Sequence, residues 1–135
     1  MDITDKLNMT MLCDFYELTM GNGYLEAGLK DQITYFDIFF RDVPDHGGYA
    51  ICAGLEQVIE YLENLHFEEE DIDYLRSTGL FEEDFLDYLR HFHFSGDVYA
   101  IPEGTVVFPR EPLVKVIAPI MEAQLVETAL LNIIN

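Results

Sequence analysis

The residues best suited to chemistry lie in one short segment near the N-terminus. In CDFYELTM, residues 13–20, Asp14 provides a carboxylate and Tyr16 a flat aromatic ring. A carboxylate can stabilise positive charge that develops on a reacting carbon, and a tyrosine ring can stack on a heteroaromatic ligand at low entropic cost. The structural alternative is that Asp14 caps a helix and that Tyr16 packs, half-buried, on the segment YFDIFF. The residues alone favour this structural alternative.

Arg41 is the second candidate, because bases are scarce in this chain. The sequence has 7 Lys and Arg residues against 26 Asp and Glu residues. Arg41 ends the segment QITYFDIFFR, just before the loop DVPDHGG. Its guanidinium group can donate two parallel hydrogen bonds to a phosphate group. An ion pair with Asp42 or Asp45 explains the same residue equally well.

The other polar motifs carry weaker signals. RHFHF places His91 and His93 on one side of an extended segment, but no further His or Cys cluster completes the ligand set of a metal site. We therefore predict no metal site in this chain. The two cysteines, Cys13 and Cys52, are too few for a disulfide framework.

Composition limits both the class of protein and its partners. The 135 residues are enough for one domain with a real core, and 50% of them are hydrophobic. The net charge of −19 at pH 7 would be repelled by phosphate groups, so we expect neither nucleic acid nor a membrane as a partner. No apolar run approaches the roughly 20 residues of a membrane span, and the polar, acidic N-terminus is unlike a secretory signal. We therefore expect a cytoplasmic protein.

The elements that must position these residues follow from hydrophobic periodicity and turn residues. We expect a helix over 11–27 and a strand over 32–41, the strand apolar on both faces and therefore covered on both. Gly21 lies inside the first helix and suggests close packing there, or an early end of the helix. Further helices are expected at about 53–65, 68–77 and 82–90, short strands within 96–117, and a final helix over 119–135.

The final predicted helix, PIMEAQLVETALLNIIN, is apolar around almost its whole circumference. Such a helix must be buried on all sides. We therefore expect some of its neighbours to come from outside this sequence, either from a further C-terminal part or from a partner chain. Its few polar residues suit an interface with that part, or hydrogen bonds to one another and to the backbone; they are Gln124, Glu127, Thr128 and Asn132.

In their order and spacing, several segments closely resemble the N-terminal part of bacterial nicotinate phosphoribosyltransferase. They are DFYELTM, YFDIFFR, GGYAICAGLEQVIEYL, YLRSTGLF, FLDYLRHFHFSGDVYAIPEGTVVFPREPL and EAQLVETALLNIIN, and together they cover nearly the whole chain. The resemblance implies a single domain over 1–135 of the α+β class, with helices packed on short strands, as in the N-terminal domain of type II phosphoribosyltransferases. It also implies that the family's β/α barrel is absent from this chain.

The resemblance further implies a function. The family forms nicotinate mononucleotide and pyrophosphate from nicotinate and phosphoribosyl pyrophosphate, with ATP hydrolysis, in the salvage route to NAD. ATP and Mg²⁺ are implied for the full enzyme, and no cofactor is expected on this chain alone. The implied partner is a second copy in a homodimer, or a separate chain that contains the barrel.

The site residues carry over by their positions in these motifs. Tyr16 is expected to stack on nicotinate bound by the neighbouring subunit, Asp14 to lie near the reacting ribose, and Arg41 to bind phosphate or pyrophosphate. Cys13 departs from the family, which commonly has Thr there. We expect the isolated chain to be inactive; the alternative is an acidic α+β interaction module without turnover.

Overall fold

An alternation of apolar residues builds a three-stranded antiparallel sheet. The structure is a computed structural model that describes residues 8–134; residues 1–7 and 135, at the ends of the expected domain, lie outside the described residues. The strands are β1 (Ile33–Ile38), β3 (Asp97–Ala100) and β5 (Val114–Pro119), in the order β1-β5-β3. Every second residue of the central strand β5 points inward and is buried: Val114, Val116 and Ala118.

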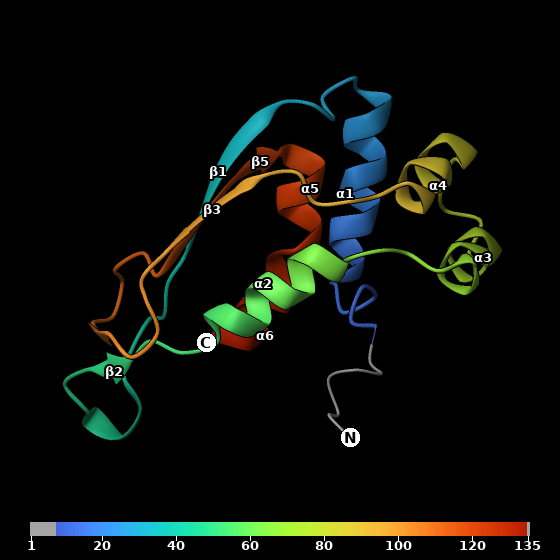
Figure 1. Cartoon of the computed structure of the whole chain (residues 1–135). Helices are drawn as coiled ribbons and strands as arrows, with labels where there is room; N and C mark the ends of the chain where they lie inside the picture. Colours follow the sequence, from blue (N-terminus) through green and yellow to red (C-terminus); the bar gives the residue numbers. More distant parts are fainter. Residues whose placement is uncertain (1–7, 135) are drawn as a thin grey trace.

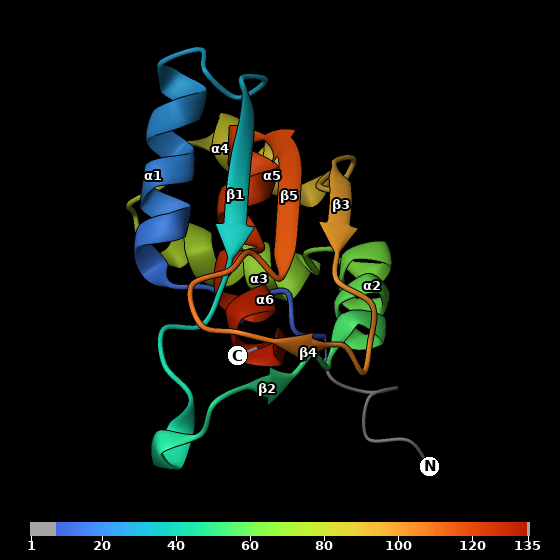
Figure 2. The ribbon, with the colours of Figure 1, turned by 90° about the vertical axis from the view of Figure 1, so that its left-hand side faces the viewer.

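The helices lie on one face of this sheet, in two layers (Figures 1 and 2). α1 (Phe15–Glu26) and α5 (Ile120–Leu125) form the inner layer, and α3 (Glu69–Ser77) and α4 (Glu83–Arg90) form the outer layer. α2 (Leu55–Asn64) packs against α6 (Glu127–Ile134) at the lower end in Figure 1. There the short strands β2 (Ala50–Ile51) and β4 (Val106–Val107) form an antiparallel pair, preceded by the 3₁₀ turn η2 (Pro44–His46).

The core is centred on α4, whose inward residues Phe85, Leu86 and Leu89 are fully buried. The Phe85 ring stacks on Phe81 at a centroid distance of 5.5 Å. Gly21 lets α1 approach this ring, since a Cβ atom at Gly21 would lie only 3.2 Å from it. Gly21 therefore marks close packing, and α1 continues beyond it to Glu26.

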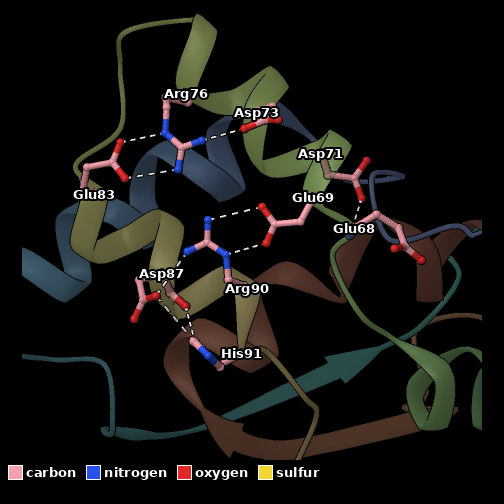
Figure 3. Close-up of polar contacts among 9 residues, drawn as sticks. All are labelled: Glu68, Glu69, Asp71, Asp73, Arg76, Glu83, Asp87, Arg90 and His91. Carbon is pink, nitrogen blue, oxygen red and sulfur yellow. Dashed lines mark hydrogen bonds and ion pairs between the residues drawn. The ribbon is translucent and has the colours of Figure 1, made fainter.

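Two arginines join α3 to α4 on the surface (Figure 3). Arg90 Nε lies 2.6 Å from Glu69 Oε1, and Arg76 Nε lies 2.8 Å from Glu83 Oε1. The same guanidinium groups also pair within their own helices, with Asp87 and Asp73 respectively. Because all these groups are solvent-accessible, the pairs fix the relative orientation of α3 and α4 more than they stabilise the fold.

The first helix begins later than the sequence pattern predicts. α1 starts at Phe15, not at residue 11, because the preceding residues form a turn tied to the end of α2. The Oγ1 of Thr10 accepts a hydrogen bond from the backbone N–H of His66, at 3.3 Å. Asp14 then takes the extended N-cap conformation, and the chain leaves α1 through Gly28 at φ +70°.

The expectation that both faces of the first strand are covered is wrong within residues 8–134. The outward side chains Ile33 and Tyr35 are 54% and 68% exposed, whereas the inward Ile38 is 6% exposed. In Figure 2 the outer face of the sheet points toward the viewer, with α4 and α5 behind it. Although β1 carries apolar residues on both faces, the described chain buries only its inner face.

The final segment is two helices, not one. Pro119 still belongs to β5, paired with Ile33, and α5 and α6 are separated at Val126. All residues from Met121 to Val126 are buried by the sheet and by neighbouring helices of the same chain. The expected need for outside neighbours is therefore wrong for α5. α6 is partly open: Asn132 is exposed, and the half-buried residues are Glu127, Thr128, Leu131, Ile133 and Ile134.

Candidate functional site

Asp14 and Tyr16 both lie at the start of α1, beside the first turn of α6. The Asp14 side chain is exposed and makes no capping hydrogen bond, so its carboxylate stays available to a ligand. Its backbone N–H donates instead to Thr128 Oγ1 of α6, at 3.3 Å. The helix cap expected from the sequence is thus only positional: Asp14 occupies the N-cap site without using its side chain there.

Tyr16 presents its ring to solvent. It is 46% exposed, and its hydroxyl group donates to Glu127 Oε2 of α6 at 3.2 Å. Partial desolvation and the Glu127 carboxylate raise the pKa of the phenol to about 12, so the group keeps its proton at neutral pH. Phe15 and Met20 are also exposed, at 48% and 41%. The first turns of α1 therefore carry an open aromatic surface suited to stacking on a flat ring.

Glu17 follows the candidate residues Asp14 and Tyr16 and points into the core, and no sequence pattern had marked it as functional. Its side chain is fully buried, and Thr128 donates a hydrogen bond of 2.7 Å to its Oε1. The Oε2 atom has no partner. Burial, with smaller contributions from Glu127 and Asp14, raises the pKa of this carboxyl group to about 7, and hydrogen bonding from Thr128 opposes the rise. A sequence signal existed: Glu17 precedes Gly21 by one helical turn, on the face that packs inward.

The other groups near this junction are also kept neutral. Burial, with smaller contributions from Glu17 and Asp14, raises the pKa of the Cys13 thiol to about 12. That thiol is therefore not a ready nucleophile. Burial likewise raises the pKa of Tyr61, whose buried hydroxyl group has no hydrogen-bond partner.

Arg41 lies just beyond the end of β1 and is exposed. Among the described residues it takes part in no ion pair, so the expected alternative of a pair with Asp42 or Asp45 is not formed. β1 ends at the same end of the molecule where α1 begins (Figure 2). No hydrogen bond or ion pair between described residues joins Arg41 to Asp14 or Tyr16. The structure thus places Asp14 and Tyr16 together at the start of α1, and Arg41 just beyond the end of β1 without an ion pair to any described residue.

Asp14, Tyr16 and Arg41 line neither of two hollows on the described surface. A shallow hollow of about 460 Å³ lies instead against α4 and includes Lys30, Asp87 and His91 in its lining, with none of the three predicted site residues. Within residues 8–134, no group of three or more His, Cys, Asp or Glu residues is arranged to hold a metal ion. In the same part of the chain, no helix is both long and apolar enough to cross a bilayer. The candidate site is therefore an open surface.

The fold and the candidate site together define the class of this protein. It is an α+β domain whose sheet is left uncovered on one face by the described residues and whose candidate site is an exposed surface. Residues 11–135 match the family model described as the nicotinate phosphoribosyltransferase N-terminal domain. Nicotinate phosphoribosyltransferase pncB2 of Mycobacterium tuberculosis is 48% identical over 125 residues, which are 93% of this chain and 27% of that protein. The Bacillus subtilis nicotinate phosphoribosyltransferase is 44% identical over 128 residues, covering 95% of this chain and 26% of that protein.

Solved structures show the same fold. The crystal structure of human nicotinic acid phosphoribosyltransferase matches with a TM-score of 0.83 at 34% identity, covering 92% of this chain and 25% of that one. Nicotinate-nucleotide pyrophosphorylase from Pyrococcus furiosus matches with a TM-score of 0.66 at 21% identity, which supports the fold alone. The chain belongs to the nicotinate phosphoribosyltransferase family and is its N-terminal domain. The predicted family and α+β class are thus confirmed, and the chain spans about a quarter of the length of the relatives named here.

Proposed function

We propose that this chain contributes the N-terminal part of the active site in a nicotinate phosphoribosyltransferase. In that reaction the ring nitrogen of nicotinate bonds to C1 of the ribose, the bond from C1 to pyrophosphate breaks, and nicotinate mononucleotide forms. The product feeds NAD salvage in the cytoplasm. Membership of the family supports this proposal, and the observation that carries it is the exposed ring of Tyr16 beside the free carboxylate of Asp14.

Each candidate residue has a role that suits its position. The Tyr16 ring stacks on the pyridine ring of nicotinate, with its hydroxyl group held by Glu127. The Asp14 carboxylate stabilises the positive charge that develops at C1 of the ribose. Arg41, which is free of ion pairs with the described residues, binds phosphate or pyrophosphate oxygens through its guanidinium group.

The rest of the site comes from a barrel outside this chain, in a homodimer or on a separate chain. The outer face of the sheet supports such a partner, because Ile33, Tyr35 and Tyr99 are all more than half exposed on it. The residues described here do not form a metal site, so ATP and Mg²⁺ are assigned to the barrel-containing part. The net charge of −19 argues against nucleic acid and anionic membranes as partners.

Reconstitution tests this proposal. The chain is mixed with the Bacillus subtilis relative from which its own N-terminal domain has been removed, and phosphoribosyl transfer to labelled nicotinate is measured. We expect no turnover by either part alone and turnover by the mixture. Turnover by this chain alone would contradict the proposed division of the site. A stable mixed complex without turnover would favour an acidic interaction module.

Substitutions in this chain, measured in the active mixture, test the role proposed for each residue. Tyr16→Ala is expected to raise the KM for nicotinate roughly 2- to 12-fold, the equivalent of one aromatic stack, whereas Tyr16→Phe keeps the ring and stays close to the unsubstituted chain. Arg41→Gln is expected to raise the KM for phosphoribosyl pyrophosphate roughly tenfold or more. Arg110→Gln is the matched control, because Arg110 is also exposed and its backbone N–H bonds to Phe40. Equal effects of the two arginine variants would refute the role of Arg41.

A further inference from the structure

The start of α1 is tied to α6 by hydrogen bonds that meet at one hydroxyl group. Thr128 Oγ1 accepts from the backbone N–H of Asp14 at 3.3 Å and lies 2.7 Å from Glu17 Oε1, to which it donates. Because a hydroxyl group has a single proton, this proton is committed to Glu17. The neighbouring Tyr16 is tied to the same helix through Glu127. A change in the protonation or position of Glu17 should therefore shift the positions of Asp14 and Tyr16 together.

The surroundings of Glu17 disfavour a negative charge on it. The side chain is fully buried and its Oε2 has no hydrogen-bond partner. Two further acids face it, Asp14 from the segment before α1 and Glu127 from α6. No hydrogen bond or ion pair links it to a basic residue among those described. An ionised Glu17 would thus be a third negative charge at one junction, compensated only by hydrogen bonding from Thr128.

The other titratable groups around Glu17 are neutral near pH 7. Cys13, Tyr16 and Tyr61 all have their pKa values raised, and Glu17 contributes to each of these shifts. α4 meets α1 at the apolar ring of Phe85. The acid of α5, Glu122, accepts hydrogen bonds from Ser95 instead. The pKa of about 7 for Glu17 agrees with this arrangement.

We propose that Glu17 is a positioning residue for the site described above: while it is neutral, the first turn of α1 stays packed on α6 with Thr128 between them, and loss of its proton to solvent sets a buried negative charge against Asp14 and Glu127 and loosens this junction, against the pull of the Thr128 hydrogen bond. The inference rests on the proposed function, because its consequence is that Tyr16 and Asp14 are held for nicotinate only while Glu17 is neutral. Binding of nicotinate then weakens as the pH rises through neutrality, without any change in the residues that touch the substrate.

The first test needs no enzymatic activity. The side-chain carboxyl carbon of Glu17 is followed by NMR against pH in this chain, with its signal assigned by Glu17→Gln. Fluorotyrosine labelling reports on Tyr16, assigned by Tyr16→Phe. We expect Glu17 to titrate near pH 7, where an ordinary Glu titrates near 4.5, and the Tyr16 signal to shift with the same midpoint. In Glu17→Gln the Tyr16 shift should disappear. A titration midpoint of Glu17 near pH 4.5 would overturn the proposal, and so would a Tyr16 signal that does not change over the pH range in which Glu17 titrates.

A second pair of variants protects this test against misfolding of Glu17→Gln. Thr128→Ser keeps the bridging hydroxyl group and should keep Tyr16 coupled to the Glu17 titration. Thr128→Val has nearly the same shape without the hydroxyl group and should uncouple them. Coupling that survives in Thr128→Val would show that Thr128 is not the link.

The second test uses the reconstituted mixture. Between about pH 6 and 8.5 the KM for nicotinate should rise several-fold while kcat changes little, and Glu17→Gln should flatten this rise. Glu26→Gln is the matched control, because Glu26 is an exposed acid on the same helix. A KM profile that Glu17→Gln leaves unaltered would refute the positioning role. If Tyr16→Ala leaves the KM unchanged, the proposed function fails instead, and the NMR titration still decides the state of Glu17.

Discussion

Raising the pH from 5 to 8 should destabilise this domain through Glu17. Its pKa is about 7 in the folded state, against an ordinary value of 4.5. Between these two values the folded chain holds a proton that the unfolded chain has lost, so the free energy of unfolding falls as the pH rises. At about 1.4 kcal/mol for each pH unit, the difference between the two pKa values gives a full loss of about 3.4 kcal/mol, of which about 2.5 kcal/mol falls between pH 5 and 8. That is a large part of the roughly 5–15 kcal/mol that stabilises a typical domain.

Urea unfolding followed by circular dichroism at pH 5, 6, 7 and 8 measures this loss. The substitution Glu17→Gln keeps an oxygen facing Thr128 but carries no charge, so its stability should change little over the same range. The salt-bridged Glu69 and Glu83 have lowered pKa values, so any contribution from them has the opposite sign, a gain of stability with rising pH, and it ends as the unfolded chain becomes fully ionised above pH 5. Parallel pH profiles for the two proteins would refute the assignment of a buried, neutral Glu17.

His66 is the one complication in this window. Hydrogen bonds with the Asn64 carbonyl group and with Glu68 raise its pKa, so its contribution to stability is also present at low pH and is lost as the pH rises. The side chain is 56% exposed, which keeps this contribution small. The variant His66→Gln separates the two effects, because it should retain most of the pH dependence.

Three further substitutions test the packing of the fold. Phe85→Ala removes a fully buried ring and should cost about 3–5 kcal/mol in urea unfolding, with Phe85→Leu losing clearly less. Gly96→Ala would place a Cβ atom 2.7 Å from the carbonyl oxygen of Ile117, which should separate β3 from β5 and cost about 1–3 kcal/mol, measured as a fall in Tm. Arg90→Gln breaks the link to Glu69 and should lower Tm only slightly at low salt and not at ~1 M salt. A salt-independent effect would contradict that account.

Local sequence patterns located most of the secondary structure, because turn residues and hydrophobic period act over a few residues. The expected helices at 68–77 and 82–90 are observed as α3 (Glu69–Ser77) and α4 (Glu83–Arg90), with Glu68 and Glu82 as their N-caps. The start of the first helix was missed because Thr10 is held by His66, 56 residues away. The final helix was expected one residue too early because Pro119 stays in the sheet, paired with Ile33, and its division at Val126 was missed.

The candidate site, too, could be predicted from the sequence only in part. Asp14, Tyr16 and Arg41 could be selected from the sequence, since their chemistry and their places at the ends of elements are local properties. Their roles toward nicotinate and phosphoribosyl pyrophosphate stay predictions. The spacing from Gly21 could place Glu17 on the inward face of the helix, but its raised pKa could not be predicted, because that depends on Thr128 and Glu127, 111 and 110 residues further along the chain. Burial of an acid changes its proton affinity only once the fold has removed water from it.

The sequence by itself determined the family, the α+β class, the acidic surface and an aromatic, acidic start to the first helix. The tertiary structure alone decided which face of the sheet the helices cover, and it leaves Ile33 and Tyr35 open to a partner. It also decided that Thr128 lies between Asp14 and Glu17. The physical reason is that side-chain alternation and helix period are set by neighbours in sequence, whereas desolvation is set by whatever the folded chain brings alongside.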